Sequence, residues 1–191
     1  NGIGKSTLLK SIVNKLPLLH GDVSFGSNVS VGYYDQEQAN LTSSKRVLNE
    51  LWDEYPLQPE KEIRTILGNF LFTGDDVLKP VSSLSGGQKA RLALAKLMMQ
   101  KSNLLILDEP TNDIDVNTLR ALEEGLENFA GCAVIISHDR WFLDRVTTHI
   151  LAFEGNSKVV WFEGTYSDYE ENYKKRVTDT TPKRIKYKKL V

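Results

Sequence analysis

The sequence is poor in cysteine, in long apolar runs and in net charge. Cys132 is the only cysteine among 191 residues, which argues against a disulfide-stabilised scaffold and fits the reducing cytoplasm. No apolar run approaches the roughly 18 residues that a membrane-spanning helix needs, and residues 1–5 lack the basic and apolar segments of a secretory signal. With 40% hydrophobic and 26% charged residues, the chain is expected to fold as one soluble globular domain, with room for a small insertion.

The net charge of −1 hides an asymmetry along the chain. Residues 174–189 contain eight basic residues and one acid, so the rest of the chain carries about −8. A basic C-terminal tail over residues 174–191 indicates a polyanionic partner, and a solvated tail without a partner is the alternative.

The first residues match the end of a phosphate-binding loop. The loop pattern G-x-x-x-x-G-K-[ST] ends with Gly4, Lys5 and Ser6, and its first glycine would fall two positions before Asn1. The sequence is therefore expected to begin inside this loop. The apolar spacing over residues 6–15 predicts the helix that follows such a loop. The apolar face of this helix would hold Leu8, Leu9, Ile12 and Val13.

The middle of the chain changes from β-prone to helical. Residues 22–26 and 29–34 are short, β-prone and punctuated by glycine, so antiparallel strands are expected there. Helical spacing follows over residues 45–55 and 59–72, with a proline between the two helices. We expect a small helical subdomain over about residues 45–100.

A serine and two glycines precede the next predicted helix, which runs to about residue 100. Ser85 in the N-cap position, followed by Gly86 and Gly87, leaves backbone N–H groups free at the positive end of a helix, which suits an anion. Gln88 adds a polar side chain near this end. An ordinary helix cap is the alternative for the tripeptide alone.

A short apolar run ends on two adjacent carboxylates. Residues 104–107 show no polar alternation, as expected for a parallel strand buried on both faces. Asp108 and Glu109 follow at its carboxyl end, where ligands bind in open α/β sheets. Neighbouring side chains of a strand point to opposite sides. Asp108 is therefore expected to hold Mg²⁺ together with Ser6, and Glu109 to polarise a water for attack on a γ-phosphate.

Another helix and another strand follow the two carboxylates. Residues 116–129 are predicted to form an amphipathic helix, and residues 133–137 a second buried strand that leads to His138. A histidine at the carboxyl edge of a strand can contact a γ-phosphate, and a purely structural histidine is the alternative. The inward face of the helix would hold Leu119, Leu122, Leu126 and Phe129.

Taken in order, these motifs resemble the nucleotide-binding domain of the ATP-binding-cassette superfamily along nearly the whole chain. The resemblance covers Walker A at residues 4–7, the Q-loop at Gln36, the signature at residues 84–88, Walker B at residues 104–109, the D-loop at Asp115 and the switch at His138. It implies a P-loop α/β fold with a mostly parallel core sheet, a small antiparallel part and a helical subdomain, and it implies ATP and Mg²⁺ as ligands.

The same resemblance implies a role for each motif. The phosphates of ATP would contact Asn1, Gly2, Gly4, Lys5, Ser6 and Thr7. Mg²⁺ would be held by Ser6, Gln36 and Asp108, and hydrolysis would use Glu109, His138 and Gln36. In such domains ATP is sandwiched head to tail between two copies. The residues that would act on the partner domain's nucleotide are Ser85, Gly86, Gly87 and Gln88, with Asp115 beside them.

Within the superfamily, residues 108–112 and 137–143 are similar to the ABC-F class. Proteins of this class carry two cassettes in one chain, have no membrane domain and act on ribosomes. The resemblance implies a cytoplasmic ATPase whose second cassette spans residues 1–173 and is followed by the basic tail at 174–191. Its partners would be the missing first cassette and the ribosome, with rRNA and tRNA as candidate contacts.

Three other interpretations are open on the sequence alone. The ATPase subunit of a membrane transporter shares every nucleotide motif, although the segment after His138 fits the ABC-F class better. A DNA-repair or chromosome-maintenance ATPase would carry a long coiled coil within the domain, and the sequence has none. The third is a binding fragment without activity, because the first part of the phosphate loop is missing.

Overall fold

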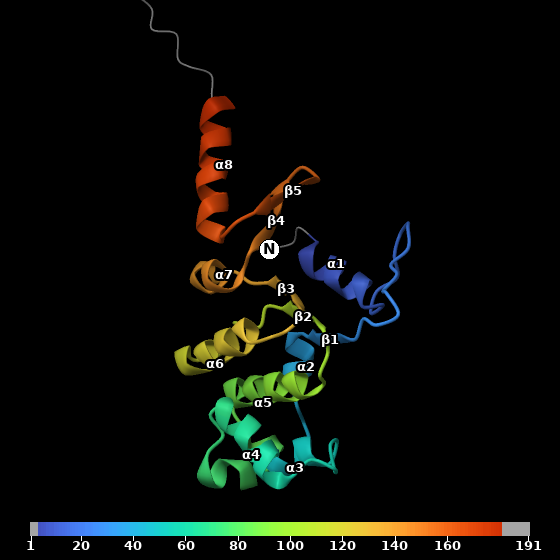
Figure 1. Cartoon of the computed structure of the whole chain (residues 1–191), viewed down its shortest axis with the longest axis vertical. Helices are drawn as coiled ribbons and strands as arrows, with labels where there is room; N and C mark the ends of the chain where they lie inside the picture. Colours follow the sequence, from blue (N-terminus) through green and yellow to red (C-terminus); the bar gives the residue numbers. More distant parts are fainter. Residues whose placement is uncertain (1–3, 181–191) are drawn as a thin grey trace, which may run out of the picture. The chain divides into compact units, whose positions relative to one another are not determined.

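The computed structural model describes residues 4–180 of the chain, which divide after Phe142 into two compact units (Figure 1). The first unit contains α1 (Lys5–Ile12), β1 (Val31–Tyr34), α2 (Gln36–Ala39), α3 (Val47–Trp52), α4 (Glu60–Asn69), the 3-10 helices η1 (Gly74–Leu78) and η2 (Val81–Ser83), α5 (Gly86–Met99), β2 (Leu104–Asp108), α6 (Val116–Glu127) and β3 (Cys132–Ile136). Helix α7 (Arg140–Val146) spans the division. The second unit contains β4 (His149–Gly155), β5 (Lys158–Glu163) and α8 (Tyr166–Thr180). Within the described residues, no helix is long and apolar enough to span a bilayer.

A three-stranded parallel sheet in the order β1-β2-β3 forms the centre of the first unit. The apolar residues of β2 at positions 105–107 are at most 2% exposed, as predicted for a strand covered on both faces. Leu9 of α1 packs with Tyr33, Ile106 and Ile136, one from each strand, in a shared core. The predicted parallel core sheet is therefore confirmed. Leu8, expected on the same buried face of α1, is 39% exposed instead.

The prediction of antiparallel strands over residues 22–34 is wrong. Residues 22–26 form no strand, and β1 pairs with β2 in parallel. A Cβ at Gly32 would lie 2.9 Å from the Leu105 side chain and 3.0 Å from the Leu97 side chain, so β1 is pressed against both β2 and α5. The long helical crossover between β1 and β2 brings the chain back in the parallel direction. The small antiparallel sheet lies instead at β4 and β5.

Strand β3 is much more exposed than its apolar sequence predicts. Residues 132–134 are exposed, with Val134 at 44%, and only Ile136 is buried. Among residues 4–180, β3 pairs only with β2, so it forms an edge of the sheet. An apolar run indicates a buried strand but does not show whether the strand is central or at the edge, because that depends on its neighbours.

The predicted helical subdomain is confirmed, with helices shorter than expected. Its core contains Leu51 of α3, Ile63 and Leu67 of α4, and Leu92 and Leu94 of α5, all fully buried. Helix α5 thus contributes one face to this subdomain, while it also packs against α2 and β1.

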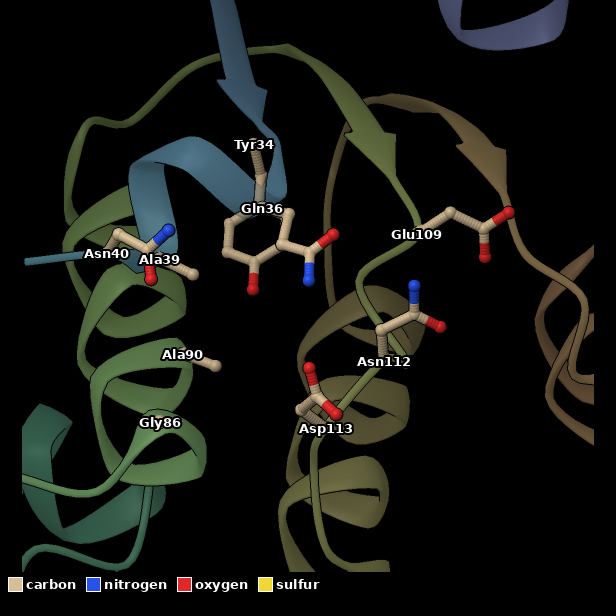
Figure 2. Close-up of a pocket in the computed structure, with 9 residues that line it drawn as sticks. All are labelled: Tyr34, Gln36, Ala39, Asn40, Gly86, Ala90, Glu109, Asn112 and Asp113. Carbon is tan, nitrogen blue, oxygen red and sulfur yellow. The ribbon is translucent and has the colours of Figure 1, made fainter.

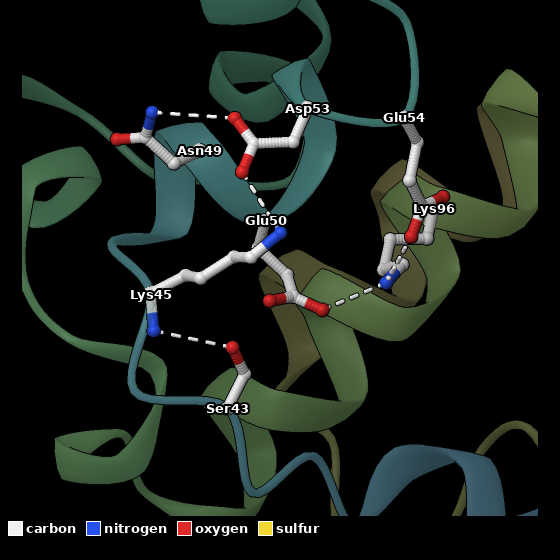
Figure 3. A network of polar contacts seen from close by, with 7 residues as sticks. All are labelled: Ser43, Lys45, Asn49, Glu50, Asp53, Glu54 and Lys96. Atoms are coloured by element: carbon white, nitrogen blue, oxygen red, sulfur yellow. Dashed lines mark hydrogen bonds and ion pairs between the residues drawn. The ribbon is translucent and has the colours of Figure 1, made fainter.

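An ion-pair network joins α3 to α5 within this subdomain (Figure 3). The Lys96 Nζ of α5 lies 2.8 Å from Glu50 Oε1 and 2.7 Å from Glu54 Oε1. Burial alone would lower the pKa of Lys96, but hydrogen bonds to the two carboxylates outweigh it and raise the pKa. Burial likewise raises the pKa of Glu50, and hydrogen bonds from Lys96 and Ser43 more than offset it. The Glu50 carboxylate of α3 and the Lys96 ammonium of α5 therefore stabilise each other's charged form.

Replacing Lys96 with methionine is expected to loosen α3 from α5. The Glu50 and Lys96 side chains are 11% and 19% exposed, so the loss should cost about 1–2 kcal/mol, less than for a fully buried pair. Hydrogen exchange of the α3 and α5 amides should then become roughly tenfold faster in the full-length protein. Lys79→Met, which breaks the more exposed pair with Asp76, is the matched control and should change exchange by less than about threefold. Equal effects of the two substitutions would contradict a special role for Lys96.

In the second unit, Glu154 ties the hairpin to α8. Its carboxylate accepts hydrogen bonds from Arg176 at 2.6 Å and from the Tyr169 hydroxyl at 3.1 Å, and pairs with Lys158 at 2.8 Å. The hydrogen bonds from Arg176 and then Lys158 lower the pKa of Glu154 to about 2. Tyr169 also packs edge-on against Phe162 of β5.

Helix α8 continues through residue 174, where the basic tail was predicted to begin. The first three basic residues of that segment each have an acidic partner: Lys174 with Glu170, Lys175 with Glu171, and Arg176 with Glu154. The other five basic residues of the tail lie in 181–191, outside the described residues. The boundary between cassette and tail at residue 173 stays a prediction.

Candidate functional site

The N-terminus of α1 has the geometry of an anion site. Gly4 precedes the helix in the left-handed conformation, with φ at 88°, and no side chain caps the first turn. The first helical hydrogen bond runs from Leu8 N to Gly4 O, at 2.9 Å. The N–H groups of Lys5, Ser6 and Thr7 therefore have no helical acceptor and stand at the positive end of the helix dipole. Asn1 and Gly2, predicted to complete the loop, lie outside the described residues.

The end of β2 meets this helix through a hydrogen bond between two predicted ligands. The Ser6 hydroxyl donates to Asp108 Oδ1 at 2.9 Å, although the two residues are 102 positions apart. Asp108 is 7% exposed. A hydroxyl and a carboxylate are the hard oxygen donors that Mg²⁺ prefers, so this pair fits that ion. No group of three His, Cys, Asp or Glu residues in the described part could hold a metal, so a magnesium site here needs uncharged oxygens as well.

Glu109 and His138 form a second pair at the same end of the sheet. His138 Nε2 lies 3.1 Å from Glu109 Oε1. Glu109 Oε2 is buried and has no hydrogen-bond partner among the described residues. The Glu109 backbone is left-handed, with φ at 53°, and its N–H donates to Ile136 O at 2.9 Å. One carboxylate oxygen is thus held by the histidine, while the other can accept a proton.

Hydrogen bonds in the turn after β3 hold His138 in place. The Ser137 hydroxyl accepts from Asp139 N at 3.0 Å and lies 2.8 Å from the Thr111 hydroxyl. Asp139 in turn accepts from the N–H of Phe142, in the first turn of α7, at 3.0 Å. Thr111 belongs to the segment that follows Glu109, so the turns after β2 and β3 are tied together around the Glu109 and His138 pair.

The signature segment caps α5 as predicted, and its glutamine folds back on it. The Ser85 hydroxyl accepts from Gln88 N at 3.3 Å, and Gln88 Oε1 accepts from Ser85 N at 3.0 Å, which forms a capping box. Gln88 therefore serves the cap rather than extending outward. A Cβ at Gly87 would lie 2.9 Å from the backbone oxygen of Asp113, whereas a Cβ at Gly86 would meet nothing within 4 Å.

Asp115, predicted as the D-loop residue, caps α6 with both carboxylate oxygens. Oδ1 accepts from the N–H groups of Asn117 and Thr118, and Oδ2 accepts from the Thr118 hydroxyl at 2.7 Å. The Thr118 hydrogen bond is the main cause of the lowered pKa of Asp115. Both oxygens of the Asp115 carboxylate thus accept hydrogen bonds from the first turn of α6 in the same chain.

A small pocket connects several of these motifs (Figure 2). Its lining combines Tyr34 of β1, Gln36 of the Q-loop, Gly86 and Ala90 of α5, and Glu109 directly after β2. Figure 2 shows the Gln36 side chain directed into this pocket. Among the described residues, no hydrogen bond joins Gln36 to Ser6 or Asp108. Gln36, the third predicted magnesium ligand, is therefore not bonded to the other two. The remaining lining residues are Ala39, Asn40, Asn112 and Asp113.

The sequence did not indicate Tyr34, Asn112 and Asp113 as parts of a pocket. Each of them lies within four residues of Gln36 or Glu109, and this adjacency was the available clue. Their convergence depends on the parallel pairing of β1 with β2, which places the segments after both strands at one edge of the sheet.

Comparison with known proteins identifies the family. The family model described as ABC transporter matches residues 1–112. The chain belongs to the ABC transporter family. This ATP-binding cassette is 57% identical to YdiF of Bacillus subtilis, over 97% of the chain and 30% of YdiF. It is 46% identical to the energy-dependent translational throttle protein EttA of Escherichia coli K12, an ABC-F protein, over 100% of the chain and 35% of EttA. The cassette spans about a third of the length of these relatives.

Solved structures support the same fold. The cassette aligns with the RNase-L inhibitor at a TM-score of 0.71 and 22% identity, over 93% of this chain and 35% of that one. It aligns with the ATP-binding cassette MJ0796 at a TM-score of 0.65 and 20% identity, over 85% and 81% of the two chains. The predicted cassette fold and the resemblance to the ABC-F class are confirmed.

Proposed function

We propose that this chain is the second cassette of a protein that hydrolyses ATP between two cassettes and uses the cycle on the ribosome. The observation that carries the proposal is the arrangement at the end of β2. There Asp108 pairs with Ser6 of the phosphate loop, and Glu109 pairs with His138. Asp108, the last residue of β2, and Glu109, which follows it, thus supply an oxygen donor for a metal and a candidate base.

Each residue at this edge then has a defined task. The N–H groups of Lys5, Ser6 and Thr7, with the Lys5 ammonium, bind the phosphates of ATP. Ser6, Asp108 and Gln36 would hold Mg²⁺, which neutralises charge on the transferred phosphoryl group when it is bound. Glu109 Oε2 accepts a proton from the attacking water. His138 holds Glu109 Oε1 and would contact the γ-phosphate.

The signature acts on the nucleotide of the other cassette. The free N–H groups of Gly86 and Gly87 at the start of α5 suit a γ-phosphate that approaches from outside the chain. A γ-phosphate held at once by a phosphate loop and by the opposite signature would close the two cassettes. Its loss on hydrolysis would remove that clamp, which ties the conformation of the protein to the state of its nucleotide.

The ribosome is proposed as the partner because the name of EttA describes an energy-dependent throttle of translation. A basic tail could contact rRNA phosphates in a salt-dependent manner. Since Lys174, Lys175 and Arg176 have acidic partners, the tail residues after 180 are the stronger candidates for such contacts. The tRNA on the ribosome is a further candidate contact.

Co-sedimentation tests the proposal directly. The full-length protein with Glu109→Gln, and with the equivalent glutamate of the other cassette replaced, should pellet with ribosomes in ATP. We expect at least fivefold less in the pellet with ADP, because ADP lacks the γ-phosphate that closes the cassettes. A lysate separated into ribosomes and membranes provides the comparison. Pelleting with membranes and not with ribosomes would favour the ATPase subunit of a transporter and would contradict the proposal.

A further inference from the structure

We propose that Lys15 is a positioning residue that sets the location of Gln36 from the far end of the phosphate-loop helix. This inference rests on the proposed ATPase function, since Gln36 is a candidate ligand of the magnesium that accompanies ATP. It concerns a lysine that lies ten residues after Lys5 of the phosphate loop and belongs to none of the motifs.

Both neighbours of Gln36 in the sequence are paired with lysines near α1. Lys15 Nζ lies 3.0 Å from Asp35 Oδ2, and Lys10 Nζ lies 3.8 Å from Glu37 Oε1. Gln36 is therefore bracketed by two ion pairs that connect its backbone to the helix whose N-terminus forms the phosphate site. Helix α1 thus links a phosphate-binding end to the start of the Q-loop.

The Gln36 side chain depends on this support, because it makes no hydrogen bond of its own to the rest of the described chain. Its side chain extends into the pocket (Figure 2), so its place there is set by the backbone on either side. Asp35 directly precedes α2, and its carbonyl accepts the hydrogen bond from Ala39 N at 3.3 Å. A shift of Asp35 would therefore move the whole four-residue helix that carries Gln36.

The two ion pairs differ in burial, and this difference singles out Lys15. The Asp35 side chain is only 4% exposed, whereas Glu37 is 80% exposed. An ion pair at an exposed site contributes little, but a buried carboxylate that loses its cation is strongly disfavoured. The Lys15 ammonium also lies 4.3 Å from the centre of the Tyr33 ring, on the strand that leads into Asp35.

The position of Lys15 is itself fixed by the end of α1. Asn14 adopts the left-handed conformation with φ at 59°, and the Lys15 N–H donates to Lys10 O at 2.8 Å. These features terminate α1 shortly before Lys15, whose side chain is 37% exposed and whose ammonium lies at Asp35. The backbone of Lys15 is thus fixed by the end of α1, while its side chain is held by the ion pair with Asp35 and the contact with the Tyr33 ring.

The experiment compares Lys15→Met with Lys10→Met in the full-length protein. The two variants remove the same charge from the same helix region, and each breaks one of the two pairs beside Gln36. Lys15→Met should raise the Mg²⁺ concentration for half-maximal ATP hydrolysis about fivefold and lower kcat about tenfold. Its affinity for ATP without Mg²⁺ should stay within twofold. Lys10→Met should change all three values by less than twofold, and Lys15→Arg, which keeps the charge, should recover most of kcat.

Hydrogen exchange supplies a measurement that does not require hydrolysis. The amides of residues 35–40 should exchange about tenfold faster in Lys15→Met than in the parent, and at the parent rate in Lys10→Met. If the parent protein does not hydrolyse ATP, the proposed function fails, and exchange alone still tests the positioning role. Equal exchange in the two variants would overturn that role. A lower melting temperature for Lys15→Met with unchanged Mg²⁺ dependence and kcat would also overturn it, because a merely structural lysine would behave in that way.

Discussion

Replacing Glu109 with glutamine is expected to lower the rate of ATP hydrolysis by about 10²–10⁴-fold while ATP binding is retained. Glu109 Oε2 is the buried oxygen without a hydrogen-bond partner in the described chain, so it can accept the proton of an attacking water. Glutamine keeps the shape of the side chain and can still accept a hydrogen bond from His138 through its oxygen. The substitution therefore removes the base and leaves the surrounding geometry in place.

Single-turnover hydrolysis and nucleotide binding, measured on the same protein, check this expectation. Glu127→Gln provides the control, because Glu127 is an exposed carboxylate at the end of α6. Its turnover should match that of the parent within about twofold, as expected for a surface substitution. His138→Ala should give an intermediate loss, since it removes the contact to Glu109 Oε1 but not the carboxylate. Turnover by Glu109→Gln above about a tenth of the parent rate would exclude Glu109 as the base.

The sequence predicted that the Asp108 and Glu109 side chains point to different partners, because successive residues of a strand face opposite sides. The structure directs Asp108 to Ser6 and Glu109 to His138, but Glu109 lies just beyond β2, so the turn and not strand alternation sets its direction. The left-handed backbone of Glu109 could not be predicted. It depends on the turn after β2 and on the hydrogen bond to Ile136 O, which requires β3 in register.

The orientation of β1 shows where local pattern stops being informative. Residues 31–34 of the predicted segment do form a strand, but its direction relative to β2 depends on the path of more than 60 intervening residues. Short glycine-punctuated strands favour hairpins on local grounds. Here position 32 requires glycine for another reason, because the Leu97 and Leu105 side chains approach it so closely that they leave no room for a Cβ. The same sequence feature thus has two physical explanations, and only the tertiary contact distinguishes them.

The glycines of the signature present the same ambiguity. A glycine at this position can leave room for a phosphate, yet Gly87 is also constrained by its own chain, through the backbone oxygen of Asp113 at 2.9 Å from its ideal Cβ, whereas Gly86 is not. A backbone oxygen cannot rotate away as a side chain can. Gly87 therefore fixes the spacing between α5 and the segment that leads to the Asp115 cap, and the signature and the D-loop are packed as one piece.

Gly87→Ala and Gly86→Ala should consequently change stability in opposite directions. The alanine at position 87 overlaps the Asp113 oxygen and should destabilise the protein by about 1–3 kcal/mol. The alanine at position 86 meets nothing within 4 Å, and alanine favours a helix over glycine by up to about 1 kcal/mol. Denaturant unfolding of the two variants measures this difference, and hydrogen exchange of residues 112–118 locates it. Equal stabilities would mean that the D-loop segment shifts at no cost. In that case the glycine at 87 would be needed only for the phosphate of the opposite cassette, and hydrolysis would be lost without any change in folding.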